Sequence, residues 1–379
     1  MTGALAGFRI LDLSRVLAGP YCSMIFGDLG AEVIKVEAPG GSDETRHWGP
    51  PFQEGVSAYY LSANRNKESI TLDLRTLEGQ EQFRELVKTS DVVLHNFKTG
   101  TMEKFGLGYE SLAELNPKLV FCSITGFGET GPLKDLPGYD FILQGMSGLM
   151  QITGTPESGP QKMGVAIVDI LTGLYACIGI QAALLERNMS GKGQKIDLSL
   201  YDCAVSSLVN IGSNYLMTGK EPLRRGNTHA QIAPYQTFNA KDGLLIVAVG
   251  TNTQFQALCD LVGWKPPECF STNAGRVENR ETLTSILQLY LQEQTVSTWV
   301  EQMRAVGIPC GPVQTFEQLT NDPQLVHRNM WVTQSHPVAG SIRLIGSPLH
   351  LSRTPVTYRL APPEPGQHQT KWIKRREHS

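Results

Sequence analysis

The first third of the chain alternates short apolar runs with segments of helical spacing, and this alternation constrains the fold more than any other feature. Apolar runs typical of buried strands cover residues 8–13, 32–37, 69–74, 91–96 and 119–124. Helical patterns lie between them, and the first, over residues 21–29, ends at Gly30, a residue typical of helix C-termini. Strands separated by helices pair in parallel, because the return to the same sheet edge needs a long crossover. The sequence therefore predicts a doubly wound, Rossmann-like α/β domain.

The turn after the first expected strand argues against one class of ligand. Residues 14–20 contain a single glycine where a dinucleotide-binding fold has the pattern G-x-G-x-x-G, so we do not expect NAD binding. The net charge of −3 gives no reason to expect nucleic acid or an anionic membrane as a partner. The longest apolar run, residues 170–185, is interrupted by polar residues and glycines, so we expect no membrane span.

Beyond residue 225 the pattern changes to paired strand-like runs followed by helical ones, at 234–238, 244–249, 254–262 and 280–306. We therefore expect a large Rossmann-like domain over residues 1–225, a smaller α+β domain over 226–325, and a return to the large domain with a tail over 326–379. A composition of 41% hydrophobic and 18% charged residues is that of a globular protein able to bury both cores. The basic end of the tail is expected to be solvated.

Asp169 stands out because it is a lone carboxylate between two apolar stretches. Residues 165–168 have the composition of a strand, and a helical pattern without proline runs from Ile170 to Arg187. From this local pattern Asp169 is a helix N-cap, whose side-chain oxygen accepts from the first turn. A carboxylate in apolar surroundings is also a candidate nucleophile. The two roles are compatible, because a helix N-terminus stabilises an anion.

The cysteines indicate a reducing compartment. The chain has seven, scattered in mostly apolar surroundings and without a C-x-x-C pair, which predicts free thiols and neither a disulfide framework nor a metal site. Residues 1–7 lack the basic and apolar regions of a signal peptide. We expect a cytoplasmic protein, with the mitochondrial matrix as the alternative in a eukaryote.

Several segments together resemble the family III CoA-transferases, the group that contains formyl-CoA transferase and the carnitine CoA-transferases. The resemblance extends from about Leu5 to Thr370. It is carried by residues 12–20 (DLSRVLAGP), 28–37 (DLGAEVIKVE), 64–67 (NRNK), 138–140 (GYD), 148–154 (GLMQITG) and 191–194 (GKGQ). Each segment alone is a weak signal, but their order and spacing over nearly the whole chain make the match specific.

Within this family the chain is similar to the succinyl-CoA:glutarate type, through residues 43–46 (DETR), 48–51 (WGPP) and 228–236 (THAQIAPYQ). The resemblance implies an enzyme that moves CoA from an acyl-CoA, such as succinyl-CoA, to a carboxylate acceptor, most often a dicarboxylate. The CoA thioester is then a substrate, and no tightly bound cofactor or metal is implied. It also implies a homodimer whose two chains interlock as rings.

The resemblance further implies which residues act. Asp169 matches the family's catalytic carboxylate, which attacks the thioester to form a mixed anhydride and then an aspartyl-CoA thioester. The matched CoA-binding positions follow strands of the large domain: Val16, Leu17, Ala18, Leu72, Asn96, Phe97, Lys98 and Lys104. Ala38 departs from the pattern, because formyl-CoA transferase has an arginine there. Lys35 and Arg46 are candidates to supply the missing charge.

A dicarboxylate acceptor leaves a second carboxylate to bind. Arg46 is the first candidate, since a guanidinium can bind a carboxylate through two hydrogen bonds, although a neighbouring acidic residue, Asp43 or Glu44, is an alternative partner for it. Tyr139, His229 and Tyr235 are further candidates. Gly250 begins the segment that matches a mobile glycine-rich segment of the family, and with one glycine we do not expect it to close in the same way.

Two other functions remain open from the sequence. An α-methylacyl-CoA racemase shares this fold, but such racemases have histidine where this chain has Tyr139, and tyrosine is a poor proton relay near neutral pH. The second is a non-catalytic CoA-binding protein, against which the presence of Asp169 weighs.

Overall fold

The computed structural model describes residues 3–373, which form two compact units. Unit 1 contains the chain up to residue 150, residues 162–220 and the chain from 326 onward, and unit 2 contains residues 151–161 and 221–325. The chain thus returns to unit 1 at residue 326 and leaves it slightly before the expected residue 225. The short excursion of residues 151–161 into unit 2 was not expected.

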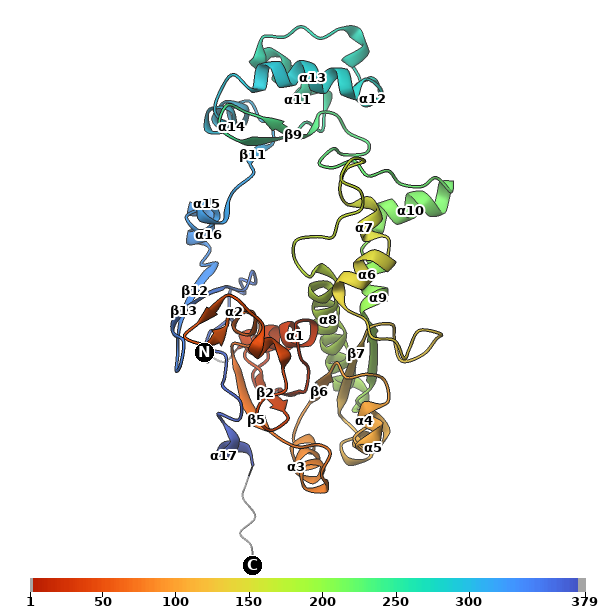
Figure 1. Cartoon of the computed structure of the whole chain (residues 1–379), viewed down its shortest axis with the longest axis vertical. Coiled ribbons are helices and arrows are strands. Elements are labelled where there is room, and N and C mark those ends of the chain that lie inside the picture. Colours follow the sequence, from red (N-terminus) through yellow and green to blue (C-terminus); the bar gives the residue numbers. More distant parts are fainter. Residues whose placement is uncertain (1–2, 374–379) are drawn as a thin grey trace, which may run out of the picture. The chain divides into compact units, whose positions relative to one another are not determined.

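Unit 1 is built on a six-stranded, all-parallel sheet (Figure 1). Its strands lie in the order β5 (Lys67–Thr71), β2 (Glu32–Glu37), β1 (Arg9–Asp12), β6 (Val92–His95), β7 (Val120–Thr125) and β8 (Lys195–Ser199). The chain starts in the middle, winds to one edge, returns, and winds to the other, which is the order of a Rossmann-type doubly wound sheet. The predicted α/β architecture is confirmed. The topological switch point lies between β1 and β6.

Helices cover both faces of this sheet and bury two apolar clusters. On one face lie α1 (Ala18–Asp28), α8 (Ile167–Ser190) and α9 (Leu200–Ser206). On the other lie α3 (Leu77–Val87), α4 (Thr101–Lys104) and α5 (Tyr109–Leu115). Strand residues alternate between the two clusters: Ile10 faces the first and Leu11 the second. A strand buried on both faces reads as a continuous apolar run, and this is the signal by which the sequence predicted these strands.

Helix α8 begins earlier than the sequence predicts. The expected strand over residues 165–168 does not form, and the helix starts at Ile167. Val168, Thr172, Ala176 and Ile180 are buried at helical spacing against α1 and the sheet, and this burial draws the apolar run into the helix. Among the described residues, α8 is the one helix whose length and mean hydropathy of 1.8 also suit a membrane span.

The other elements of unit 1 lie outside this sheet. They are η1 (Glu44–His47), β3 (Phe52–Gln53), β4 (Val56–Ser57), α2 (Ala58–Ser62), α6 (Asp140–Met146), α10 (Val209–Thr218), β12 (Trp331–His336), β13 (Gly340–Ile345) and α17 (Gln369–Trp372). Strands β12 and β13 form their own hairpin. Helices α7 (Leu149–Ile152) and α16 (Pro323–His327) lie at the boundaries between the units.

The tail packs along the edge of the sheet as far as Ile373. His368 Nδ1 and Gln369 Oε1 accept from the backbone N–H groups of Ser69 and Thr71, on the free edge of β5. Trp372 packs against the apolar cluster beneath. The tail up to Ile373 thus covers an exposed sheet edge and is not simply solvated. The basic end expected to be solvated, residues 374–379, lies outside the described residues.

Unit 2 has a small antiparallel sheet with helices. Its strands lie in the order β11 (Cys310–Pro312), β10 (Leu244–Ala248) and β9 (Tyr235–Asn239). Its helices are α11 (Asn252–Val262), η2 (Glu268–Phe270), α12 (Asn273–Glu278), α13 (Arg280–Leu291), α14 (Val296–Ala305) and α15 (Phe316–Thr320). They enclose a core of their own, as an α+β domain requires.

Candidate active site

A cavity of about 270 Å³ opens at the switch point of the sheet in unit 1. Segments that follow three of the strands line it, and α6, α8 and the loop at Trp48 complete it. Open α/β sheets place ligands at this position, outside the carboxyl ends of the strands. The lining residues with functional groups are Arg15, Glu44, Trp48, Asn96, Lys98, Thr99, Thr125, Lys134, Asp135, Tyr139, Asp140 and Asp169.

Asn96 fixes one wall of this cavity, the turn between β1 and α1. Its side-chain oxygen accepts from the Arg15 N–H (2.9 Å), and its side-chain nitrogen donates to the Arg15 carbonyl (2.7 Å). The turn at the end of β1 is therefore tied to the end of β6, the two strands that flank the switch point. On the far side, Gly126 and Gly138 approach so closely that a Cβ on either would meet backbone of the other.

Asp169 is half-buried and is the third residue of α8. It is not the N-cap that the sequence predicts, because the helix begins two residues earlier and Ala166, at the cap, has no side-chain hydrogen bond. Asp140 of α6 serves the helix start instead, since its Oδ1 accepts from the Val168 N–H at 2.8 Å. A carboxylate distant in sequence thus caps the turn that carries Asp169.

Electrostatics keep Asp169 only weakly acidic. Burial, helped by the negative charge of Asp140, raises the pKa of Asp169 to about 7. Burial, with the charges of Asp169 and Asp140, also raises the pKa of Tyr59 to about 12, so its hydroxyl stays protonated at neutral pH. Tyr59 stands on α2, and its ring packs edge-on against Trp48, which lines the cavity. The protonated phenol of Tyr59 therefore lies close enough to Asp169 for the two groups to interact electrostatically.

A second cavity of about 300 Å³ shares Arg15 and Phe97 with the first. Ala38, Leu72 and Arg75 are among the residues that line the rest of it. The Arg15 guanidinium lies 5.6 Å from the Phe97 ring centre, at the place common to both cavities. A ligand longer than one cavity could therefore extend past Arg15 into the other.

Most of the predicted CoA-binding residues meet at these two cavities. Val16, Ala18, Asn96, Phe97 and Lys98 line the first, and Leu72 and Phe97 line the second. Two predicted residues are not among the described residues that line either cavity. Leu17 is the N-cap residue of α1, and Lys104 is exposed at the end of α4.

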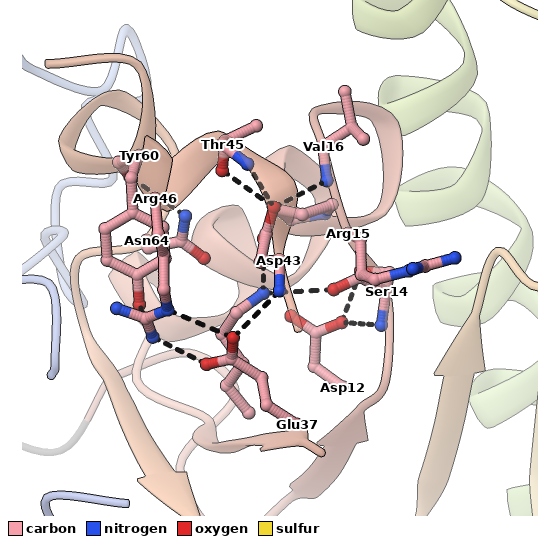
Figure 2. Close-up of polar contacts among 12 residues, drawn as sticks. Asp12, Ser14, Arg15, Val16, Glu37, Asp43, Thr45, Arg46, Tyr60 and Asn64 are labelled. Atoms are coloured by element: carbon pink, nitrogen blue, oxygen red, sulfur yellow. Dashed lines mark hydrogen bonds and ion pairs between the residues drawn. The ribbon is translucent and has the colours of Figure 1, made fainter. Parts of the chain in front are cut away.

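Arg46 lies in a buried ion pair with Glu37 (Figure 2). It is not among the described residues that line the first cavity. Its guanidinium donates to both carboxylate oxygens of Glu37, at 3.0 and 2.5 Å, and to the Tyr60 hydroxyl at 2.7 Å. Neither Asp43 nor Glu44 is its partner, contrary to the alternative that the sequence left open. Lys35 is bound to Asp43. Both cations are held in buried ion pairs and so cannot replace the charge missing at Ala38. Arg15 and Arg75 line the same cavity as Ala38, and their own ion pairs, with Glu44 and Asp73, are solvent-accessible.

Tyr139 is exposed and lines the first cavity, and its role toward the acceptor stays a prediction. His229, Tyr235 and Gly250 belong to unit 2 and gather at one end of the β9–β10 hairpin. The His229 and Tyr235 rings lie 5.2 Å apart. The Gln254 side chain accepts from the N–H groups of Gly250 and Thr251, at 2.9 and 3.2 Å, and so anchors this segment.

Sequence reasoning missed Arg15, Trp48, Tyr59 and Asp140. Arg15, Trp48 and Asp140 lie within motifs that carried the family resemblance, so a signal was available. No pattern in the sequence singles out Tyr59, which packs from α2 against Trp48 of the cavity wall. No cluster of His, Cys, Asp or Glu side chains suited to a metal ion occurs among residues 3–373.

Together, a doubly wound sheet and a switch-point cavity that contains a weakly acidic carboxylate are typical of an α/β enzyme. Residues 5–369 match CoA-transferase family III, and the chain belongs to that family. It is a CoA-transferase. It is 43% identical to the succinate–glutarate CoA-transferase of Agrobacterium fabrum, with 97% of this chain and 94% of the relative covered. It is 42% identical to the succinyl-CoA:glutarate CoA-transferase of Homo sapiens, with 98% and 85% covered.

A solved structure has the same fold. A CAIB/BAIF family protein from Brucella suis is 43% identical and superimposes with a TM-score of 0.89, with 98% of this chain and 100% of that chain covered. The predicted family membership and transferase activity are confirmed.

Proposed function

We propose that this enzyme moves CoA from succinyl-CoA to a short dicarboxylate of the glutarate type, with Asp169 as the nucleophile. The support is twofold. The two relatives named for this donor and acceptor match nearly the whole chain. Asp169 lines the switch-point cavity with a pKa of about 7, so it is a stronger nucleophile than an ordinary carboxylate. This second observation carries the mechanism.

The first half-reaction removes the donor acid. A carboxylate oxygen of Asp169 attacks the thioester carbonyl of succinyl-CoA, the carbon–sulfur bond breaks, and CoA leaves as the thiolate. The product is a mixed aspartyl–succinyl anhydride. The thiolate then attacks the aspartyl carbonyl, which releases succinate and leaves an aspartyl-CoA thioester.

The second half-reaction repeats these steps with the acceptor. A carboxylate of the acceptor attacks the aspartyl-CoA thioester, giving an aspartyl–acyl anhydride and CoA thiolate. The thiolate attacks the acyl carbonyl of the anhydride, so that the acyl-CoA product leaves and the Asp169 carboxylate returns. No proton, electron or water is consumed over the cycle. Water must be kept out, because both intermediates hydrolyse.

The groups around Asp169 suit this chemistry. The Tyr59 hydroxyl, protonated at neutral pH, can donate to oxygen as negative charge develops there. Arg15, Lys98 and Lys134 are the cations that line the first cavity, and they are candidates for the second carboxylate of the acceptor in place of Arg46. His229 and Tyr235 stay predictions for that role.

CoA is proposed to lie across both cavities, with its thioester near Asp169. Arg15 stands where the two meet, and Arg75 lines the second beside Ala38. Phosphate groups bind best to guanidinium side chains, which offer several fixed donors. Arg15 and Arg75 are therefore the candidates to replace the arginine absent at Ala38.

The working form is proposed to be an interlocked homodimer in the cytoplasm. Helix α10 is rich in apolar residues, yet none of its residues is buried within the chain, and an apolar helix of this kind needs a partner surface. For location, all seven cysteines are free, and five of them are buried, which is usual in a reducing compartment.

The test is to trap the intermediates. The enzyme is incubated with succinyl-CoA, quenched with hydroxylamine, digested and mapped by mass spectrometry, and transfer to labelled glutarate is followed in parallel. A hydroxamate at Asp169 together with glutaryl-CoA is expected. The matched control is the Asp202→Asn variant, because Asp202 lies on α9 and lines neither cavity. In this variant Asp169 should be converted to the hydroxamate to the same extent as in the wild type.

Two results would contradict the proposal. Loss of deuterium from the acyl α-carbon without any exchange of CoA would mean racemase chemistry. Binding of CoA without reaction of any acyl-CoA would mean a non-catalytic CoA-binding protein. Transfer to other acids but not to glutarate would overturn the acceptor class alone.

A further inference from the structure

The turn between β1 and α1 holds one residue in a strained conformation. Val16 is β-branched, and its φ of +70° lies in the left-handed region that such residues rarely adopt. A conformation of this kind persists only where surrounding groups impose it. Gly19 keeps the turn closed, since its backbone lies so near Ser14 that a Cβ there would overlap the Ser14 side chain.

Asp43 is the group best placed to impose this conformation (Figure 2). Its Oδ1 accepts from the Val16 N–H at 3.1 Å, and its Oδ2 accepts from Lys35 Nζ at 2.8 Å. Lys35 Nζ also donates to the Ser14 carbonyl at 3.0 Å. One ion pair therefore holds both ends of the segment 14–16. The N–H and hydroxyl of Thr45 donate to Oδ1, at 3.2 and 2.7 Å, and fix its orientation.

This ion pair is fully buried, because the side chains of Lys35 and Asp43 are both 0% exposed. Burial alone would raise the pKa of Asp43, but Lys35 and the hydrogen bonds lower it to about 2, so the carboxylate stays charged. A buried ion pair is often no better for stability than two apolar residues of similar volume. The position of the Lys35–Asp43 ion pair therefore says more about its role than its contribution to stability does.

The pair connects two segments that line the cavity of Asp169. One is the turn itself, through Arg15 and Val16, and the other follows Asp43 directly, through Glu44 and Trp48. Arg15 also donates to Glu44 at 2.9 Å across the two segments. Movement of Asp43 would thus displace two walls of the cavity together.

We infer that Asp43 is a positioning residue for the CoA thioester: held by Lys35, it keeps Val16 left-handed and so fixes the cavity wall formed by the β1–α1 turn. The inference rests on the proposed function for the identity of the ligand only. Removing the hydrogen bond to the Val16 N–H should let Val16 relax and weaken CoA binding. A glycine at position 16, which adopts a φ of +70° without strain, should make Asp43 less necessary.

The experiment compares two variants of the full-length enzyme that differ only at residue 43. Lys35→Met with Asp43→Asn removes both charges but keeps an oxygen for the Val16 N–H, whereas Lys35→Met with Asp43→Leu has similar volume and no acceptor. The Kd of CoA is measured by titration calorimetry, and KM and kcat with succinyl-CoA. The Kd of CoA and the KM of succinyl-CoA should be about tenfold higher in the variant with Asp43→Leu than in the variant with Asp43→Asn. The kcat values of the two variants should differ by less than threefold.

Val16→Gly is then added to both variants. The ratio of the CoA Kd values of the Asp43→Leu and Asp43→Asn variants should fall from about tenfold to less than threefold. Circular dichroism and Tm show whether each variant is folded. Equal CoA binding by the Leu and Asn variants, or a difference that Val16→Gly leaves unchanged, would overturn the inference. A general loss of stability would lower Tm without this dependence on residue 16.

Thr45→Val tests the same inference if the Lys35 variants do not fold. It retains both charges and removes the hydroxyl that orients Asp43. It should raise the Kd of CoA two- to fivefold in the wild-type background but not in the Val16→Gly background. If Thr45→Val raises the Kd of CoA equally in both backgrounds, the inference is contradicted. Because Kd is measured with CoA alone, failure of the proposed acceptor or of the anhydride mechanism is recognised separately, as intact CoA binding without transfer.

Discussion

In the proposed mechanism, the groups around Asp169 set its reactivity. Asp140 on α6 adds a negative charge, Tyr59 on α2 offers a hydroxyl, and Arg15 and Lys98 are the cations after β1 and β6 that line the same cavity. Burial, followed by the charge of Asp140, raises the pKa of Asp169 to about 7. A carboxylate of this basicity is a better nucleophile than one with an ordinary pKa, but it must be deprotonated to act.

Asp169→Asn should abolish transfer and stabilise the fold at high pH. We expect loss of activity by a factor of about 10³ or more, since no other group replaces the nucleophile. Because the folded-state pKa is raised from 3.8 to about 7, the folded protein binds more protons than the unfolded one between these values, and stability falls as pH rises through that window.

The uncharged amide of the Asp169→Asn variant avoids that loss. The Tm of this variant should exceed the wild-type value by about 2–4 °C at pH 8 and by progressively less as pH falls to 4. Thermal unfolding at several pH values measures this difference. An equal difference at pH 4 and pH 8 would show that Asp169 is not the group that titrates.

Asp140→Asn should shift the pH dependence of the reaction. The amide oxygen of this variant can still accept from the Val168 N–H, so the start of α8 keeps its cap, but the negative charge that raises the pKa of Asp169 is gone. The midpoint of kcat/KM against pH, expected near 7 in the wild type, should fall by about 1 unit. Asp135→Asn changes another carboxylate of the same cavity and is the matched comparison. A midpoint that moves equally in both variants would remove the specific role of Asp140.

At the scale of elements, the sequence predicts the buried parallel strands best. Their continuous apolar runs indicate buried strands, and the strand over residues 32–37 forms within the predicted bounds. Helix starts and breaks were harder, because they depend on tertiary contacts. Residues 201–218 read as one helix in the sequence, but the structure divides them into α9 and α10, and Val209, after the break, has a φ of +34°.

The candidate site was predictable where it lies on the turns that follow strands and not where side chains reach it through space. Val16, Asn96 and Phe97 follow strands, so strand order alone brings them to the switch point. Arg46 was assigned to the acceptor from its charge alone. Its partner Glu37 ends β2, and no local pattern shows that the chain folds one onto the other.

The packing of α1 on α8 gives an element-scale prediction, because these helices carry Ala18 and Asp169. A Cβ at Gly173 would lie 2.7 Å from the Ala18 carbonyl oxygen, so Gly173→Ala must push the helices apart. It should cost about 1–3 kcal/mol and lower kcat/KM. Gly179→Ala on the same helix meets no atom nearer than 3.7 Å and should stabilise by about 0.5–1 kcal/mol. Denaturant unfolding ranks the two, and equal effects would contradict the close-packing argument.

At the scale of the whole molecule, the described residues that line the two cavities belong to unit 1. The predicted residues His229, Tyr235 and Gly250 belong to unit 2. Unit 1 also leaves apolar side chains uncovered along two helices, with Ile178, Leu185 and Met189 exposed on α8 and Leu216 and Met217 on α10. Such a surface favours association, and a second copy of the chain is the partner that the proposed homodimer supplies.

Charged residues on α10 should therefore prevent the dimer from assembling. Leu216 and Met217 are 84% and 83% exposed in the single chain, so replacing both by lysine disturbs nothing within it and acts only where another surface covers them. We expect sedimentation velocity at micromolar concentration to show a dimer for the wild type and a monomer for the double variant, because each buried, unpaired ammonium opposes association. Leu289→Lys, at a 63% exposed position on α13, is the matched control and should stay dimeric. A wild-type monomer, or a double variant that remains dimeric, would show that this apolar surface is not the dimer interface.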